Sequence, residues 1–591
     1  MSRNVESHFA KLPQAEIGRS RFDRSSTHKT TFNAGKLVPI YVDEVLPGDT
    51  FSMDVASLVR MSTPIFPVMD NAYLDTYFFF VPNRLVWEHW KEFNGENNET
   101  YWTQPVEYSV PTLSQPYESY DSDNNGWNKG SVADYLGIPT EVCGESVNAL
   151  PFRAYALIWN EWFRDQNTMA PAEFYRDDSN RVGIRSSNGS LDDARLSAHL
   201  GGDLLPVCKY HDYFTSALPA PQKGPAVSVP FEAGLLPVYS LSRTGPSGDA
   251  GANFTDFEPL FIGDNVWNSD SLRLYRENGQ LGSSGSVNYK YGEFYSDGVT
   301  PSVDPDTNLS LYPGNLYAVP GENFAPTINS LRQAFQIQKL FEKDARGGTR
   351  YTEILKAHFG VDSPDARLQR PEYLGGKRIP INIDQVLQTS STDSTSPQGN
   401  AAAYSLTVDT DSSFVKSFTE HGFIIGLCCV RTDHTYQQGL DRMWSRKRRF
   451  DFYWPALANL GEQAILSKEL GQVSRFPGDS SVNLNDAAFG YQEAWAEYRY
   501  KPSRVSGAFR SNYAQTLDSW HYADYYDLGT GTSPTPVYLS EEWMQETDVN
   551  IDRTLAVSSE VEDQFIADFY FKCDCVRPMP LYSIPGLIDH H

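Results

Sequence analysis

One pattern near the C-terminal end of the chain constrains the fold more than any other feature of the sequence. In FIADFYFKCDC (565–575), apolar residues occupy every second position. Because side chains two apart in an extended strand point to the same side, the pattern predicts a long β-strand with one buried face. The residues expected on that face are Phe565, Ala567, Phe569, Phe571, Cys573 and Cys575.

Strand and turn signals also begin at Leu37 and continue to about residue 82. Phe51, Met53 and Val55 alternate with polar neighbours, as expected of a half-buried strand. Strands near both ends of a long chain, with large segments between them, suggest that the two ends pair in one sheet system. We therefore expect an all-β fold with helical and loop insertions.

Two helices are expected in the interior of the chain. Pro151 suits a first helical turn, and aromatic residues recur at intervals of three and four between Phe152 and Phe163. Such an aromatic stripe is typical of a helix that packs on a core. A second helix is predicted over about 327–346, where a pair of glycines ends it.

The composition excludes a disordered chain and a protein that binds nucleic acid through its bulk charge. Hydrophobic residues make up 40% of the 591 positions, and 13% are aromatic, which is enough for a large core. The 75 acidic residues outnumber the 49 Lys and Arg, so the net charge is −26. Any contact with a polyanion must therefore be local.

Six cysteines are too few for a scaffold built from disulfides, which favours a reducing compartment. The sequence contains no phosphate-loop, dinucleotide, zinc-protease or serine-hydrolase motif, and no CxxC pair. It also has no signal peptide and no apolar run of about 20 residues. We therefore expect a protein without catalytic residues, metal or cofactor, and without a membrane span.

The first 36 residues carry a local charge of +4, because seven Lys and Arg outnumber three acids. With few aliphatic residues and no clear period, the segment 1–36 is interpreted as an extended basic arm, or alternatively as a terminus without a role. The candidate DNA contacts in this arm are Arg19, Arg21, Arg24 and Lys29.

The segment 232–325 differs from the scaffold segments 37–231 and 326–591 on either side. Its 94 residues include 12 Gly and 7 Pro, and 12 acids against four Lys and Arg give a charge of −8. Thirteen aromatic residues argue against disorder, so we interpret the segment as an ordered, turn-rich insertion on a loop. Its aromatic residues either pack several insertions together or stack on glycans. The candidates are Trp267, Tyr289, Tyr291, Phe294 and Tyr295.

The densest basic cluster lies in LDRMWSRKRRFDFYWP (440–455), where aromatic residues alternate with cations. This composition is typical of a groove for single-stranded nucleic acid, in which cations contact phosphates and rings stack on bases. Alternatively, the cations pair with carboxylates of this chain or of a neighbouring subunit. The sequence leaves both alternatives open. The five cations are Arg442, Arg446, Lys447, Arg448 and Arg449.

Several long blocks of the sequence resemble the major capsid proteins of gokushoviruses, within the Microviridae. The opening SRFDRSSTHKTTFNAGKLVPIYVDEVLPGDTF (20–51) is similar to the same family. Together the blocks cover most of the chain outside 232–325. They are ALPAPQKGPAVSVP (217–230), the block 331–376 that begins LRQAFQIQKLFEKD, HGFIIGL (421–427), the block 435–464 that begins TYQQGLDRMW, FGYQEAWAEYRYKPSRVSGAFRS (489–511) and RPMPLYSIPGLIDH (577–590).

The resemblance implies a viral jelly roll, in which eight antiparallel strands form two sheets. It also implies that about 60 copies assemble into a T=1 icosahedral shell around circular single-stranded DNA. In this family a loop insertion forms a surface protrusion for host attachment, which we expect at 232–325.

Further partners implied by the resemblance are a small basic DNA-packaging protein, a minor pilot protein and a bacterial surface receptor. The expected location is the virion, assembled in the host bacterial cytoplasm. A competing hypothesis, suggested by the acidic and aromatic-rich composition, is a β-sandwich protein that binds or cleaves glycans.

Overall fold

The computed structural model describes most of the chain. The described residues are 18–96, 106–225, 328–361, 368–387, 401–474, 483–529 and 534–582, without 120, 121, 123, 188 and 349 but with 227, 389, 392, 398 and short strands between 238 and 318. The chain divides into two compact units, one of Met1–Lys223 with Glu342–His591 and one of Gly224–Phe341.

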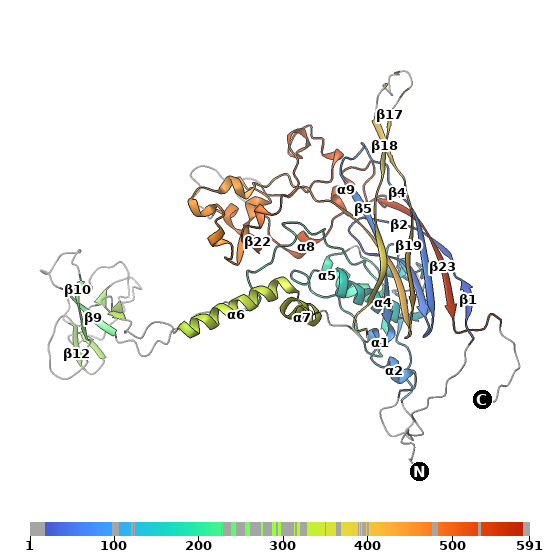
Figure 1. Ribbon diagram of the computed structural model, residues 1–591, viewed down its shortest axis with the longest axis horizontal. Coiled ribbons are helices and arrows are strands. Elements are labelled where there is room, and N and C mark those ends of the chain that lie inside the picture. Colours follow the sequence, from blue (N-terminus) through green and yellow to red (C-terminus); the bar gives the residue numbers. More distant parts are fainter. Residues whose placement is uncertain are drawn as a thin grey trace, which may run out of the picture. The chain divides into compact units, whose positions relative to one another are not determined.

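The larger unit is built around two antiparallel sheets (Figure 1). The order of the first sheet is β1 or β2, β23, β4 and β19, and that of the second is β16, β5, β20 and β3. The strands of the first are β1 (Ser20–Asp23), β2 (Ser26–Phe32), β4 (Thr50–Met61), β19 (Thr407–Ser417) and β23 (Phe565–Arg577). Those of the second are β3 (Val38–Val45), β5 (Ala72–Pro82), β16 (Glu372–Pro380) and β20 (Gly422–Thr432).

The strand order is that of a jelly roll. β1 pairs with one end of β23 and β2 with the other, so the two short strands share one position in the sheet. With β1 and β2 counted together as the first strand, the two sheets read 1-8-3-6 and 2-7-4-5 along the chain. This is the arrangement of two Greek keys in a double-sheet jelly roll. The predicted fold class, an eight-stranded antiparallel jelly roll with helical and loop insertions, is confirmed.

The hydrophobic core lies between these two sheets. β23 buries every second side chain, as its sequence pattern predicts. Phe571 of this strand packs edge-on against Phe78 of β5, with ring centroids 6.3 Å apart, which joins the two layers. The thiols of Cys573 and Cys575 are fully buried, and burial raises the pKa of Cys573 to about 11.

The N-terminal boundary of the scaffold lies earlier than the sequence predicts. Residues 1–36 are interpreted above as an extended arm, but β1 and β2 show that residues 20–32 belong to the first sheet. The prediction is wrong here because β2 is an edge strand whose residues are mostly polar, with only Phe32 fully buried. Such a strand shows little apolar alternation in its sequence.

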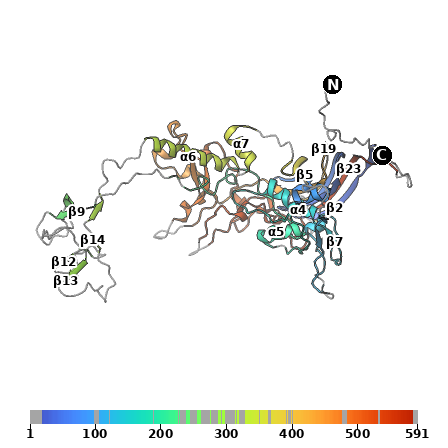
Figure 2. The same ribbon diagram turned by 90° about the horizontal axis from the view of Figure 1, so that it is seen from below.

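The connection between β5 and β16 carries most of the helices, and Figure 2 shows α4 beside β5. Its elements in the larger unit are α1 (Asn83–Val86), α2 (Trp90–Phe93), β6 (Thr112–Ser114), α3 (Val132–Tyr135), β7 (Ser146–Asn148), α4 (Leu150–Ile158), a π-helix (Trp159–Phe163), β8 (Arg181–Val182), α5 (Leu191–Ser197), a 3-10 turn (Ala198–Leu200) and α7 (Tyr351–Phe359).

The aromatic stripe predicted from Phe152 to Phe163 packs on the core, but its residues become less buried toward the end of the helix. Phe152, Tyr155 and Trp159 are fully buried, whereas Trp162 is 39% exposed. The difference arises because the helix continues after Ile158 as a π-helix, whose wider turn shifts the following residues around the axis.

The connection between β20 and β23, residues 433–564, is mostly irregular. We call it the long connection. Its elements among the described residues are β21 (Glu462–Leu466), β22 (Ala488–Glu493), α8 (Glu541–Met544), α9 (Val549–Asp552) and 3-10 turns at Arg442–Ser445, Arg449–Asp451, Pro455–Leu457, Ser467–Glu469, Leu484–Asp486, Ala496–Tyr498, Gly507–Phe509 and Asp518–Trp520. Between β16 and β19, β17 (Ile383–Leu387) and β18 (Ala401–Ser405) form a two-stranded ribbon.

The smaller unit contains short strands. They are β9 (Val238–Arg243), β10 (Phe254–Pro259), β11 (Leu274–Tyr275), β12 (Val287–Lys290), β13 (Glu293–Ser296), β14 (Tyr312–Pro313) and β15 (Leu316–Ala318). The helix predicted over 327–346 is confirmed as α6 (Ile328–Gly347), which begins in the smaller unit and ends in the larger one. Within the described part of the chain, the helices include none with both the length and the apolar composition of a membrane span.

Candidate nucleic-acid interface

Three of the four candidate cations near the N-terminus form ion pairs within the chain. The Nε of Arg21 donates to Asp574 at 2.9 Å, and the Nε of Arg24 donates to Asp43 at 3.0 Å. Lys29 on β2 lies 3.2 Å from Asp568 on β23. Arg19 precedes β1. The positive charges of Arg21, Arg24 and Lys29 are therefore largely matched by acids of the same chain.

The basic cluster at 442–449 separates into an inward and an outward group. Arg442 and Arg446 point inward. Arg446 donates to Glu497 at 2.8 Å and lies over the ring of Tyr498, at 4.2 Å from its centroid. Arg442 donates to the carbonyl oxygen of Ala464 at 3.0 Å. Both side chains are largely buried, so these two arginines hold the long connection together.

Lys447, Arg448 and Arg449 form the outward group and are exposed. The carboxylate of Asp451 accepts hydrogen bonds from the backbone N–H groups of Lys447 and Arg448, at 2.8 and 2.7 Å. These bonds lower the pKa of Asp451 and fix the turn. The guanidinium of Arg449 lies 4.8 Å from the ring centroid of Trp454.

Large aromatic side chains surround these three cations and are also exposed. Phe450 is 70% exposed and Trp444 is 66% exposed. Covering exposed rings of this size with another molecule lowers the free energy, because apolar surface is removed from water. We call this region the aromatic–basic surface. It comprises Trp444, Lys447, Arg448, Arg449, Phe450, Phe452, Tyr453 and Trp454.

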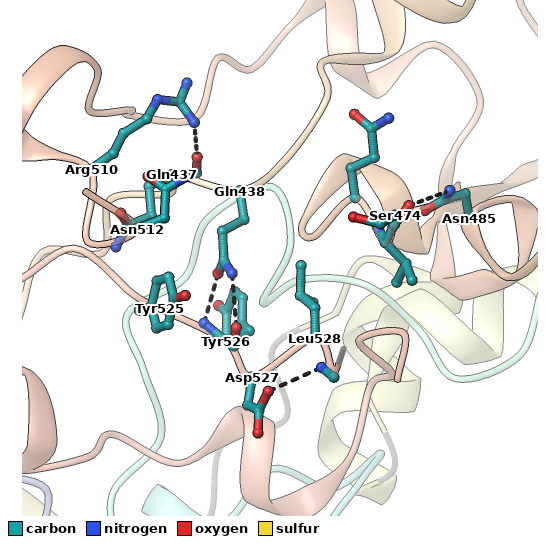
Figure 3. A pocket seen from close by; sticks show the side chains of 13 residues that line it. Gln437, Gln438, Ser474, Asn485, Arg510, Asn512, Tyr525, Tyr526, Asp527 and Leu528 are labelled. Carbon is teal, nitrogen blue, oxygen red and sulfur yellow. Dashed lines mark hydrogen bonds between the residues drawn. The ribbon is translucent and has the colours of Figure 1, made fainter. Parts of the chain in front are cut away.

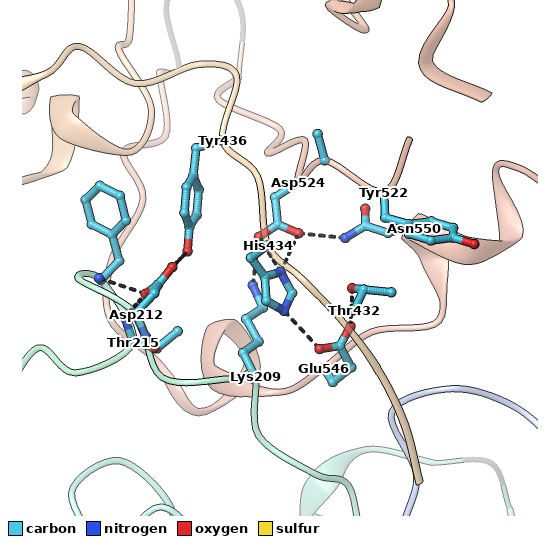
Figure 4. Close-up of polar contacts among 12 residues, drawn as sticks. Lys209, Asp212, Thr215, Thr432, His434, Tyr436, Tyr522, Asp524, Glu546 and Asn550 are labelled. Atoms are coloured by element: carbon cyan, nitrogen blue, oxygen red, sulfur yellow. Dashed lines mark hydrogen bonds and ion pairs between the residues drawn. The ribbon is translucent and has the colours of Figure 1, made fainter. Parts of the chain in front are cut away.

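A buried polar network anchors the long connection to the rest of the larger unit (Figure 4). Asp524 accepts from Lys209 at 3.1 Å and from Asn550 at 2.6 Å, and contacts Nδ1 of His434 at 3.2 Å. The other ring nitrogen of His434 lies 2.9 Å from Glu546. Lys209 comes from the connection before β16, and His434 is the second residue after β20. The network therefore joins three separate segments of the chain.

The charges of this network hold one another in the ionised state. Burial by itself would lower the pKa of His434, but the carboxylates of Glu546 and Asp524 outweigh burial and raise that pKa to about 10. Burial would likewise raise the pKa of Asp524, but Lys209 and His434 hold it well below its usual range. The described residues contain no cluster of His, Cys, Asp and Glu suited to a metal ion.

The candidates in the predicted insertion are only partly described. Tyr289 lies on β12, and Phe294 and Tyr295 lie on β13, which pairs with β12 as a hairpin. Trp267 and Tyr291 lie outside the described residues. Their proposed role in contacts between copies or with a host stays a prediction.

The comparison with known proteins decides the family. A family model described as capsid protein (F protein) matches residues 10–587. The chain is 42% identical to capsid protein VP1 of Chlamydia phage 1, over 99% of this chain and 98% of the relative. It is 40% identical to capsid protein VP1 of Bdellovibrio phage phiMH2K, over 99% and 98%, and 41% identical to that of Spiroplasma virus 4, over 95% and 94%.

The chain belongs to this capsid protein family. The predicted resemblance to gokushovirus major capsid proteins is thereby confirmed, and the capsid protein is a structural component of the virion. The competing hypothesis of a protein that binds or cleaves glycans receives no support from these relatives. Self-assembly into a shell is the activity that defines such a protein.

The sequence did not indicate which residues of the capsid protein support the aromatic–basic surface. Glu497, the partner of Arg446, lies about 50 residues further along the chain and has no distinctive neighbour in the sequence. The members of the buried network are equally scattered, between positions 209 and 550. Glu497 lies inside one of the blocks that resemble the family (489–511), whereas the members of the buried network lie outside those blocks.

Proposed function

We propose that about 60 copies of the capsid protein form a T=1 icosahedral shell around a circular single-stranded DNA genome, assembled in the host bacterial cytoplasm. The observation that carries this proposal is the family match over 10–587 on a chain whose described strands have jelly-roll order. A jelly roll with long, aromatic-rich connections supports the proposal, because such connections bury their apolar surface against neighbouring copies.

The positive charge that the shell offers is too small to neutralise the genome, which implies an additional source of cations. Residues 1–36 carry a charge of +4, which gives about +240 in about 60 copies. A genome on the order of several thousand nucleotides carries one negative charge per nucleotide, and so far more negative charge than this. The chain as a whole is negative, at −26. We therefore include in the proposal a small basic packaging protein, or polyamines and metal ions, as partners inside the shell. A minor pilot protein is a further proposed partner.

Sizing and negative-stain imaging of the expressed chain test this function. We expect megadalton closed particles, and genome-filled particles that contain a second cation source. A stable, fully folded monomer under assembly conditions would contradict the shell. Filled particles that hold only genome and capsid chain would contradict the charge argument.

We further propose that the aromatic–basic surface contacts the genome through Lys447, Arg448 and Arg449. Changing these three residues to Gln is expected to leave empty shells intact and to reduce the fraction of DNA-filled ones. For purified protein, the slope of log affinity for single-stranded DNA against log salt should flatten by about 2, because each lost phosphate contact contributes about 0.7. Density-gradient separation and binding titrations measure the two effects.

A matched variant separates this site from bulk charge. Lys468, Arg499 and Arg504 lie in the same connection but pair with Asp486, Glu493 and Asp441. Their change to Gln removes the same total charge and should leave DNA filling close to that of the unmodified protein. If both triple variants reduce the fraction of DNA-filled shells equally, the effect is one of net charge. If the variant of Lys447, Arg448 and Arg449 forms no shells, the aromatic–basic surface bridges subunits.

The segment 232–325 is proposed as the protrusion that meets a receptor on the bacterial surface. Its charge of −8 and its 13 aromatic residues support a role outside the core. Loops held by a rigid scaffold can vary without disturbing assembly, which suits a surface that selects a host.

A further inference from the structure

A polar pocket in the long connection is not used by any role proposed above (Figure 3). Its volume is about 530 Å³, within the range of about 300–1,000 Å³ typical of small-molecule sites. The lining comes from residues 437–438, from 472–474 with Asn485, and from the segment 510–529. Among the described lining residues, Arg510 is the one cation and Asp527 the one carboxylate.

Amide side chains fix the walls of this pocket. The amide of Gln438 accepts from the backbone N–H of Tyr526 at 2.7 Å and donates to its carbonyl oxygen at 2.8 Å. Asn485 makes the same pair of bonds to the backbone of Val473, at 2.8 and 2.9 Å. Because each amide uses both its donor and its acceptor, the two walls are held before any ligand arrives.

Other polar groups that line the pocket remain available. Within the described part of the chain, the side chains of Gln472, Asn512 and Tyr525 make no hydrogen bond. The ring of Tyr525 is 50% exposed. Arg510 donates one N–H to the carbonyl oxygen of Gln437, and Figure 3 shows Arg510, Asn512 and Tyr525 along the same side of the pocket. The carboxylate of Asp527 accepts from the N–H of Gly529 at 3.0 Å.

These groups match the chemistry of a nucleotide. A Gln or Asn amide offers a donor and an acceptor side by side, as the edge of a nucleobase does. A tyrosine ring provides a surface on which any base can stack, and an arginine beside it can contact phosphate. An apolar peptide would instead need an apolar floor, whereas the aliphatic side chains of the described lining are Val473, which is almost fully buried, and Leu528, which is half-buried.

We propose that this pocket binds one nucleobase of single-stranded DNA. Tyr525 stacks on the base, Gln472 and Asn512 bind its edge, and Arg510 contacts the adjoining phosphate. The inference rests on the proposed function, because it takes the enclosed genome as the source of the ligand. It adds a base-contacting site to the phosphate-contacting aromatic–basic surface.

Fluorescence anisotropy with two labelled strands tests the pocket. One probe is a short oligothymidylate and the other is an abasic strand of equal length, which has the same phosphates but no bases. The full-length Tyr525→Ala protein should bind the oligothymidylate at least about fivefold more weakly, the lower limit for loss of one base–aromatic stack. Its binding to the abasic strand should be unchanged. Asn512→Ala should weaken binding in the same selective way.

Tyr513→Ala is the matched control, because Tyr513 is the neighbouring exposed tyrosine, at 56%, and does not line the pocket. It should bind both probes as the unmodified protein does. Unchanged oligothymidylate binding by Tyr525→Ala and Asn512→Ala, or an equal loss in Tyr513→Ala, overturns the proposal. Normal DNA binding combined with failed assembly of Tyr525→Ala assigns the pocket to a protein partner and also overturns it.

The experiments distinguish an error in the nucleobase proposal from an error in the proposed function. If particles contain DNA but the pocket variants bind both probes normally, only the nucleobase site is wrong. If the unmodified chain forms particles that never contain DNA, the genome-enclosing function itself is wrong.

Discussion

Replacing Asp524 by Asn is expected to lower the free energy of unfolding of the capsid protein by about 3–5 kcal/mol. Asp524 is buried and faces Lys209 and His434, so its removal leaves two buried cations with only Glu546 to balance them. An uncompensated buried charge is far more costly than a missing surface contact. Chemical and thermal unfolding of the purified chain measure the effect.

The control for this prediction is Asp54→Asn. Asp54 pairs with Lys572 at 3.2 Å across the outer face of the first sheet, and both side chains are about half exposed. The change should therefore cost less than about 1 kcal/mol. Equal destabilisation by the two substitutions would show that the buried network does not anchor the long connection.

Replacing residues 240–318 by a short Gly/Ser linker is expected to give shells that assemble and hold DNA but do not adsorb to host cells. The deleted segment lies within the smaller unit, and the strands of both jelly-roll sheets lie in the larger one. Shortening a loop changes its closure free energy little, by about 0.6 kcal/mol per halving of its length. Adsorption of labelled particles to cells measures the loss.

Deletion of TSSTDSTS (389–396), in the connection between β17 and β18, provides the control for adsorption. It shortens another connection between two strands and should leave adsorption unchanged. Normal adsorption after replacement of 240–318 would place receptor binding elsewhere. Failure to assemble would make the insertion a structural clamp between copies.

The strands of the core could be predicted from the sequence because burial on one face imposes a period of two. The strand 565–577 shows this most clearly, since its buried residues were all identified. The edge strand β2 was missed because it pairs with a neighbouring strand along one edge only. Its exposed positions can be polar, so its sequence shows little apolar alternation. Local patterns therefore locate central strands better than edge strands.

The basic cluster shows a second limit of sequence reasoning. Its composition predicted a site but could not separate Arg446, which pairs with Glu497, from its neighbours Lys447 to Arg449, which face solvent. The separation depends on a carboxylate that only the folded chain brings close. The polar pocket was not predicted at all, because its walls come from three segments with ordinary compositions.

The position of β23 has a consequence for how the virus makes its particles. This strand lies in the middle of the first sheet, between β4 and the strands β1 and β2, yet it follows all the other strands of the two sheets along the chain. A chain released before residue 565 lacks the strand that joins β2 to β4, so its first sheet cannot close. We therefore expect chains that stop before residue 565 not to enter the shell, so that each assembled subunit carries every strand of both sheets.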